Sequence, residues 1–214
     1  MKHPAESEEP AKGKPHSILE GILWPDPDPS VGPLKVDNVA RMSATSVDRL
    51  VYPQSEEEVC RIVQQALHNR QRITVRGTQH CMGGQAIPSE ATTSGGTIVL
   101  DTKFLAQMSF DPEKEHISVG PGCQWAHVLN FLNRFGKAPR TMQSYSSFSV
   151  GGTISVNAHG VTTDTTLVED IVALRLVSYK ERSIKLLTLT PDDELFSLVV
   201  GGYGLFGVVT EVTL

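Results

Sequence analysis

The stretch Arg76–Ala86, with the sequence RGTQHCMGGQA, places a glycine-bearing turn that holds one histidine directly after a short apolar segment. That segment, QRITV at residues 71–75, has the composition of a strand, so the chain passes from a sheet straight into the turn. Glycines at a strand exit let bare backbone amides converge on an anion, because no side chain blocks the approach. The turn therefore predicts a phosphate site at the end of a strand.

Two further glycine-rich turns follow, SVGGTIS at residues 149–155 and GGYGLFG at residues 201–207. A single turn of this kind is also compatible with a surface loop that carries a solvated histidine. Three of them at strand or helix ends are more than a sandwich or a helical bundle of 214 residues needs. We expect the three turns to border one groove.

The composition narrows the class of protein. A chain of 214 residues can form one large domain or two small ones without disulfides or metals. The net charge of -5 provides no basic patch, so we expect no nucleic-acid partner. We expect no membrane span either, because no run approaches about 20 apolar residues, and the N-terminus is not a signal peptide. A soluble protein, cytoplasmic by default, is the expectation.

Cysteine and histidine spacing excludes several other chemistries. The three cysteines are an odd, widely spaced set and do not form a disulfide framework. No Cys or His pair shows ligand-like spacing on a common element, so we predict no metal site. A thiol nucleophile at Cys81 is not expected, because it is adjacent to His80 on a turn and neighbouring side chains there rarely point at each other.

Residues 1–17 are rich in Glu, Lys and Pro, and four prolines between residues 25 and 33 keep the next stretch extended, so residues 1–38 predict a disordered or extended leader before a domain at 39–214. A first subdomain at about 47–105 contains a strand that ends at Pro53, a helix with a capping box, and strands near 73–75 and 97–101. The strand-helix-strand order predicts parallel strands. The glycine turn then leaves at a carboxyl end, where open α/β sheets bind ligands.

The helix in that unit is predicted from local signals. Ser55 and Glu58 form the capping box, and the inward face should carry Val59, Ile62, Val63, Ala66 and Leu67.

A second subdomain at about 106–214 should contain a larger mixed or antiparallel sheet with flanking helices. We expect a hairpin around 111–114, strands at 168–177, 184–189 and 208–214, a helix over 125–135 and a short helix capped by Thr190. The buried face of the longer helix should carry Trp125, Val128, Leu129, Leu132 and Phe135. The fold class is therefore α+β.

With these motifs assembled in order, residues 50–214 resemble the PCMH-type FAD-binding domain of the vanillyl-alcohol oxidase and p-cresol methylhydroxylase flavoproteins. The motifs are VYPQSEEEV at 51–59, the loop at 76–86, VGGTIS through AHG at 150–160 and the segment 194–210. The loop is closest to those of cytokinin dehydrogenase-like and sugar-lactone oxidase-like members.

The resemblance implies FAD as cofactor and a set of contacting residues. These are Arg76, Gly77, Thr78, Gln79, His80, Cys81, Gln85, Ser149, Gly151, Gly152, Ser155, His159 and Val209. The amides of residues 77–81 would face the pyrophosphate, and the Val209 backbone would close over the cofactor. Arg76 either adds positive charge there or forms a structural salt bridge at the sheet edge.

His80 carries the most specific expectation. In many members of the family the histidine at this position is joined covalently to the flavin 8α-methyl carbon; the alternative is that His80 only forms hydrogen bonds. The chain departs from the family pattern at Gln79, where a glycine is usual, and at Cys81, where a serine is usual. No cysteine lies between Met142 and Val150, so we expect at most one link.

Two functional interpretations follow from the resemblance. In the first, the chain is the cofactor portion of an FAD-dependent oxidase or dehydrogenase. It takes a hydride from an alcohol, sugar lactone, hydroxy acid or amine, and oxygen or another protein accepts the electrons. In the second, it is a flavin-binding module or truncated fragment without turnover. The family's substrate domain is expected to be absent after Leu214, so we assign no catalytic base.

Overall fold

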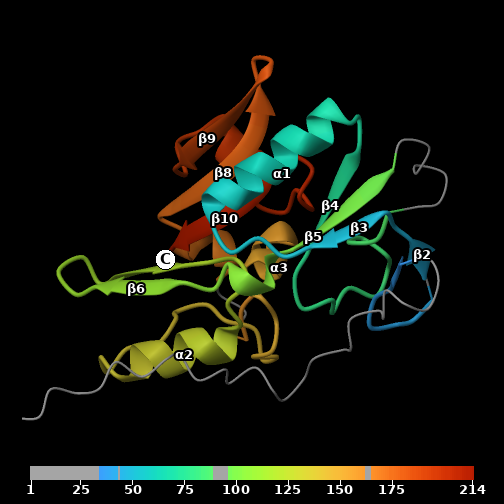
Figure 1. Ribbon diagram of the computed structural model, residues 1–214. Coiled ribbons are helices and arrows are strands. Elements are labelled where there is room, and N and C mark those ends of the chain that lie inside the picture. Colours follow the sequence, from blue (N-terminus) through green and yellow to red (C-terminus); the bar gives the residue numbers. More distant parts are fainter. Residues whose placement is uncertain (1–33, 43, 89–95, 162–164) are drawn as a thin grey trace, which may run out of the picture.

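The computed structural model describes residues 34–42, 44–88, 96–161 and 165–214, and these residues form two main sheets with helices packed against them (Figure 1). The predicted leader lies outside the described residues up to residue 33. Its last residues include β1 (Lys35–Val36), which pairs antiparallel with β2 (Thr45–Ser46).

The smaller sheet is parallel and positions the first glycine loop. Its strands are β3 (Arg49–Val51), β5 (Thr97–Asp101) and β4 (Arg72–Arg76), in the order β3-β5-β4. All five residues of β5 are buried, as expected for the central strand of a covered parallel sheet. The predicted parallel arrangement is confirmed, although β5 lies between the two strands that the helix connects. The loop leaves β4 at its carboxyl end.

Helix α1 (Glu56–His68) connects β3 to β4 and packs between the two sheets. Ser55 Oγ accepts a hydrogen bond from Glu58 N at 3.3 Å, whereas the Glu58 carboxylate accepts from Gln54 N at 2.8 Å. The cap is therefore formed as predicted, but its return bond is displaced by one residue. Leu67 was expected on the inward face and is 42% exposed instead.

The larger sheet is antiparallel throughout. It contains β6 (Met108–Asp111), β7 (His116–Val119), β10 (Val208–Thr213), β8 (Ala173–Lys180) and β9 (Ser183–Leu189), in that spatial order. The last strand of the chain, β10, thus lies at the centre of this sheet. The α+β class with a small parallel subdomain and a larger antiparallel sheet is confirmed.

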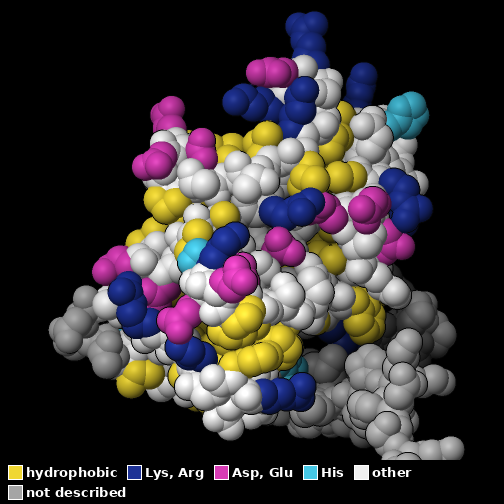
Figure 2. Space-filling view, turned by 90° about the vertical axis from the view of Figure 1, so that its left-hand side faces the viewer, with side chains coloured by type: hydrophobic (Ala, Val, Ile, Leu, Met, Phe, Trp, Pro, Cys, Tyr) yellow, Lys and Arg dark blue, Asp and Glu magenta, His cyan; other side chains and the backbone are white. Residues whose placement is uncertain are grey.

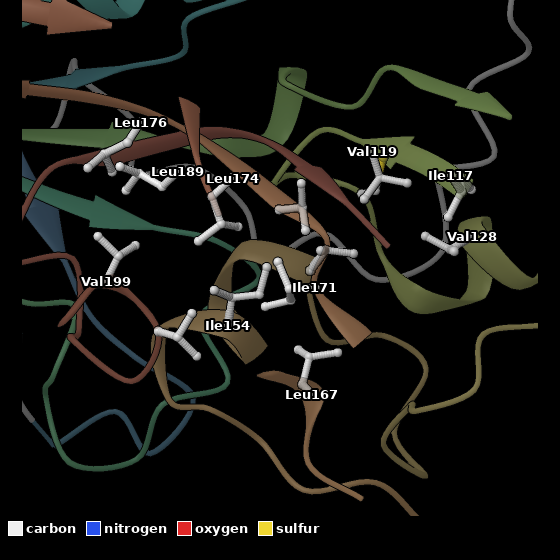
Figure 3. Packing of buried hydrophobic residues seen from close by; sticks show 14 of the residues in the cluster. Ile117, Val119, Val128, Ile154, Leu167, Ile171, Leu174, Leu176, Leu189 and Val199 are labelled. Carbon is white, nitrogen blue, oxygen red and sulfur yellow. The ribbon is translucent and has the colours of Figure 1, made fainter. Parts of the chain in front are cut away.

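Three helices accompany this sheet: α2 (Trp125–Asn133), α3 (Val150–Ser155) and α4 (Glu194–Val199). Figure 3 shows Ile154 of α3 beside Ile171 and Leu174, within one buried cluster that also includes Val199 of α4. The core therefore fixes α3 against the antiparallel sheet. Leu129 of α2 and Phe135, which lies just beyond the end of α2, were predicted to be inward and are 38% and 48% exposed.

A polar contact joins the two subdomains. Glu56, the first residue of α1, pairs with Arg175 of β8, and its Oε2 also accepts from Thr210 Oγ1 of β10 at 2.6 Å. A shared hydrophobic cluster of Val59, Leu100 and Val208 lies across the same boundary. The position of the first glycine loop relative to the second subdomain is thus fixed by packing on both sides.

Three further local predictions were wrong. The strand expected at 168–177 begins only at Ala173, because Leu167–Asp170 form a 3-10 turn with a capping box between Thr166 and Glu169. The segment 150–155 is a helix rather than a turn. The cap of α4 is Asp193, whose carboxylate accepts from the Thr190 backbone N at 2.7 Å.

The surface in Figure 2 shows basic and acidic side chains interspersed, with hydrophobic side chains between them. Several basic side chains gather at the top of this view, and over the rest of the face the two signs of charge alternate.

Candidate functional site

One cavity of about 260 Å³ is bordered by all three glycine-rich segments, which come from distant parts of the sequence. Its lining includes the loop residues 76–81, the α3 residues 151–153 and the turn residues 203, 204, 206 and 207. Val209 of β10 lies on the same wall. The expected shared groove is therefore present, and the two subdomains both contribute to it.

The first glycine loop presents a run of unpaired backbone donors to this cavity. The N–H groups of residues 77–81 donate to no acceptor in the described part of the chain. Residues 77–81 are half-buried, and backbone donors partly withdrawn from water are rarely left without a partner, so such a run favours an external acceptor. Consecutive amides of this kind form a concave site for an anion.

The contact between the first loop and α3 explains why residue 77 is a glycine. A Cβ atom at Gly77 would lie 2.2 Å from Ser149 Oγ and 3.1 Å from Ser149 Cβ, and Ser149 is 2% exposed. Thr78 Oγ1 also accepts a hydrogen bond from Ser149 N at 3.1 Å. The loop thus lies directly against the residue that precedes α3, and a side chain at residue 77 would have to displace the buried Ser149 hydroxyl.

Helix α3 is held by neighbours on both sides of the cavity. The Gly151 N–H donates to Pro121 O at 2.9 Å, and a Cβ atom at Gly151 would lie 2.7 Å from Pro121 Cβ. The third turn attaches to the end of α3 through Gly201 N to Ile154 O at 2.9 Å and Tyr203 N to Ser155 O at 3.0 Å. The two segments therefore form one continuous wall.

Arg76 lies at the base of the loop and forms a buried ion pair. Its Nε donates to Asp101 Oδ2 at 2.7 Å, and the two side chains are 5% and 6% exposed. The Asp101 Oδ1 atom accepts from Lys103 N at 2.9 Å. Of the two roles left open for Arg76, the structure shows the salt bridge, although Arg76 also lines the cavity.

His80 lies in the cavity wall with both ring nitrogens near hydroxyl groups. Nδ1 is 3.0 Å from Thr78 Oγ1, and Nε2 is 3.2 Å from Ser147 Oγ. Partial burial lowers the pKa of His80 below its usual 6.5, because desolvation disfavours the charged ring. The imidazole is therefore neutral near pH 7 and retains a lone pair.

The two departures from the family pattern have visible consequences. Gln79 adopts a left-handed backbone with φ of 60°, the conformation in which a glycine is favoured. Cys81 is half-buried and lines the cavity with a thiol where a hydroxyl would be a stronger donor.

Twelve of the thirteen predicted contact residues line the cavity, and His159 does not. His159 Nδ1 lies 2.6 Å from Gly160 O, and its backbone O accepts from Gln143 Nε2 at 3.0 Å. The contact role expected for His159 is therefore not seen in the cavity geometry.

Several lining residues were missed by sequence reasoning. They are Val75, Ala86, Thr102, Pro121, Phe148, Thr153, Val156, Ala158, Val199, Tyr203, Gly204, Phe206 and Gly207. The glycine-rich third turn was a signal for residues 203–207, and the GPG sequence at 120–122 was one for Pro121. Thr102 had no such signal, because its place in the wall depends on the register of β4 against β5.

Among the residues that the structure describes, no group of three or more His, Cys, Asp or Glu is arranged to hold a metal ion. Within the same residues, no helix combines the length and the apolar character that crossing a membrane requires.

Comparisons with known proteins agree with this geometry. A family model described as an FAD binding domain matches residues 47–186. The chain is 27% identical over 193 residues to cytokinin dehydrogenase 2 of Arabidopsis thaliana, covering 87% of this chain and 37% of that protein. It is 29% identical over 173 residues to a putative D-arabinono-1,4-lactone oxidase of Neurospora crassa, covering 79% and 30%. The chain thus spans about a third of the length of these relatives.

Solved structures show the same fold. Cholesterol oxidase from B. sterolicum superposes with a TM-score of 0.76 at 19% identity, covering 90% of this chain and 39% of that one. An alkyldihydroxyacetonephosphate synthase superposes with a TM-score of 0.68 at 20% identity, covering 77% and 30%.

A dinucleotide requires a site for its pyrophosphate and a cleft that accepts an extended molecule. The amides of residues 77–81, which have no acceptor in the described part of the chain, and the cavity shared by three segments agree with these two requirements. Together with the family model that matches most of the chain, these features confirm the resemblance to the PCMH-type flavoproteins, and the chain belongs to the FAD-binding domain family.

Proposed function

We propose that this chain is the cofactor-binding portion of an FAD-dependent oxidase or dehydrogenase that takes a hydride from a carbon bearing oxygen or nitrogen in a small molecule. The observation that carries the proposal is the run of N–H groups at residues 77–81, which have no protein acceptor and line a cavity that α3 and the third turn complete. Bound FAD would supply the two-electron chemistry.

The residues of the chain would hold and orient that cofactor. The amides of residues 77–81 would donate to the pyrophosphate oxygens, and the close packing that Gly77, Gly151 and Gly152 allow against Ser149 and Pro121 would hold the loop and α3 in place around the cofactor. Phe148, Tyr203 and Phe206 would cover apolar parts of the cofactor and keep water away from it. Oxygen or another protein would then accept the electrons.

The names of relatives support the substrate class. They include a lactone oxidase, a cytochrome-linked D-lactate dehydrogenase and L-galactono-1,4-lactone dehydrogenases, whose named substrates carry oxygen on carbon. Among the described residues that line the cavity, none is Asp or Glu, so we assign no catalytic base within it.

We further propose that His80 forms the single covalent link to the flavin 8α-methyl carbon. Its position in the cavity wall and its neutral imidazole support this role. The new nitrogen–carbon bond replaces one hydrogen of the methyl group and the imidazole N–H proton, and two electrons pass to oxygen or the acceptor protein. Acid precipitation checks this, since flavin colour that stays entirely in the supernatant would exclude the bond.

Binding of FAD can be tested by titration, following the quenching of flavin fluorescence. Gly77→Ala should weaken binding at least about tenfold, the scale of a displaced hydrogen-bonding loop. Gly136→Ala is the matched control. Gly136 has a φ of 67° and nothing within 4 Å of an added Cβ, so this change strains the chain outside the cavity. Equal affinity for Gly77→Ala and wild type would contradict the proposed site.

Turnover is tested separately with a panel of alcohols, lactones, hydroxy acids and amines under anaerobic conditions. Bleaching of bound flavin by a panel compound is the expected result. Bound flavin that no compound reduces would favour the interpretation as a binding module without turnover.

A further inference from the structure

The imidazole of His80 is held between two hydroxyl groups that come from segments far apart in the sequence. Thr78 Oγ1 is 3.0 Å from Nδ1, and Ser147 Oγ is 3.2 Å from Nε2. Thr78 lines the cavity with His80, whereas Ser147 does not. The Nδ1 edge of the ring is therefore the one held by a cavity-lining hydroxyl.

The direction of these hydrogen bonds follows from a third contact. The Ser149 N–H donates to Thr78 Oγ1 at 3.1 Å, so the Thr78 oxygen already serves as an acceptor. The Thr78 hydroxyl proton then has one acceptor in the described part of the chain, His80 Nδ1. A neutral imidazole has one N–H group and one acceptor nitrogen. With Nδ1 protonated, the Thr78 proton would have no acceptor in the described part of the chain, so Nδ1 is assigned as the acceptor and the Nε2–H group as the donor to Ser147 Oγ.

Aromatic rings restrict the rotation of the imidazole. The Phe148 ring lies edge-on at 4.7 Å between centroids with an interplanar angle of 67°, and Tyr145 lies at 6.0 Å with the same angle. Tyr145 in turn stacks on Phe148 at 5.4 Å. A ring flip would put ring carbons where the two nitrogens now lie, would break both contacts with the hydroxyl groups, and would have to displace this packing.

We propose that Thr78 and Ser147 are positioning residues that hold His80 as the Nε2–H tautomer and so leave the lone pair on Nδ1. The tautomer is inferred from the hydrogen bonds of Thr78 with Ser149 and His80. Its role, which is to present that lone pair for the bond to the flavin methyl carbon, rests on the proposed function. Thr78 has two roles, because the same oxygen also accepts the hydrogen bond from Ser149 N that holds the loop against the start of α3.

The tautomer is measured directly by two-bond nitrogen–proton correlation spectra of the 214-residue chain labelled at histidine, without added FAD. His80 is identified among the seven histidines by comparison with His80→Gln. The wild type should show an unprotonated Nδ1 and a protonated Nε2. Thr78→Val should mix the two tautomers, and Thr78→Ser should restore the wild-type pattern. A wild-type spectrum with Nδ1 protonated would overturn the proposal.

The second readout is the fraction of bound flavin that stays with the protein after acid precipitation, followed over time. Thr78→Val and Ser147→Ala should each slow covalent retention about tenfold, the effect of one lost hydrogen bond. Thr188→Val and Ser109→Ala, both at exposed strand positions, should leave it unchanged. Ser147→Ala keeps the bond from Ser149 to Thr78 and therefore separates positioning from loop anchoring.

The outcomes distinguish this proposal from the proposed function. A wild-type chain that binds no FAD would overturn the proposed function, and one that binds it without a covalent link would overturn only the link at His80; in both cases the tautomer result stands on its own. Alternatively, the wild type would retain flavin covalently, and Thr78→Val and Ser147→Ala would both do so at the wild-type rate and with the wild-type tautomer. That result would overturn the positioning role, while covalent FAD binding would stand.

Discussion

Arg76 Nε donates to Asp101 Oδ2 at 2.7 Å across the paired ends of β4 and β5, where both side chains are almost completely buried. Removing one charge of such a pair leaves the other without compensation in a poorly solvated site. Asp101→Asn should therefore lower the free energy of unfolding by about 3–5 kcal/mol. The midpoint of urea denaturation measures the loss.

The matched control is Glu115→Gln, which removes the carboxylate that pairs with Lys137 on the surface. Exposed pairs contribute little, so its unfolding midpoint should stay close to that of the wild type. If Asp101→Asn lost no more stability than Glu115→Gln, the buried pair would have no special structural role.

The same pairing leads to a prediction about cofactor affinity. Arg76 is neutralised by Asp101, and burial keeps His80 neutral near pH 7, so the amides of residues 77–81 would hold the pyrophosphate. From about 0.1 M to about 1 M salt, as the Debye length falls from about 10 Å to about 3 Å, the Kd for FAD should change by less than about threefold. Fluorescence titration at several salt concentrations measures this. A tenfold or larger loss of affinity would show that unpaired basic side chains contact the cofactor.

Sequence patterns predicted the elements that are specified locally. Helix α1 has its own cap and apolar face, and β4 and β5 have apolar runs, so each was predicted near its observed bounds. The glycine segments were also predicted to meet, because a single extended ligand requires them to converge.

Elements that depend on distant packing were not predictable. The Gly151–Gly152 pair predicts a turn, yet the burial of Val150 and Ile154 in the core stabilises a helix there and outweighs the low helix propensity of glycine. Asp101 as the partner of Arg76 follows only from the strand register. The cavity role of Phe148 depends in the same way on how segments far apart in the sequence pack together.

Gln79 offers a test of stored backbone strain. Its φ of 60° places a side chain in the left-handed region, which costs about 1 kcal/mol relative to glycine. Gln79→Gly should raise the free energy of unfolding by up to about 1 kcal/mol, offset in part by the greater freedom of the unfolded chain. Chemical denaturation measures the change.

Gln64→Gly is the control for this substitution, because Gln64 lies at an exposed position inside α1. There the same change should lower stability by about 1 kcal/mol. A loss at both positions would mean that the Gln79 side chain makes stabilising contacts that exceed the backbone strain.

The three cysteines report on whether FAD occupies the predicted cavity. Cys81 lines the cavity, whereas Cys123 is fully buried, which raises its pKa to about 11, and burial also raises the pKa of Cys60. Because the thiolate is the reactive form, Cys123 should react with a thiol reagent only after unfolding. Saturating FAD should slow the reaction of Cys81 at least about tenfold, since the reagent reaches it only when the site is free, and leave that of Cys60 unchanged. Mass spectrometry of alkylated peptides measures each rate.

In the control variant Cys81→Ser, only the slow reaction of Cys60 should remain in the folded chain. Equal slowing at Cys60 would indicate general stabilisation by the cofactor, and no slowing at Cys81 would place FAD away from the loop at residues 77–81.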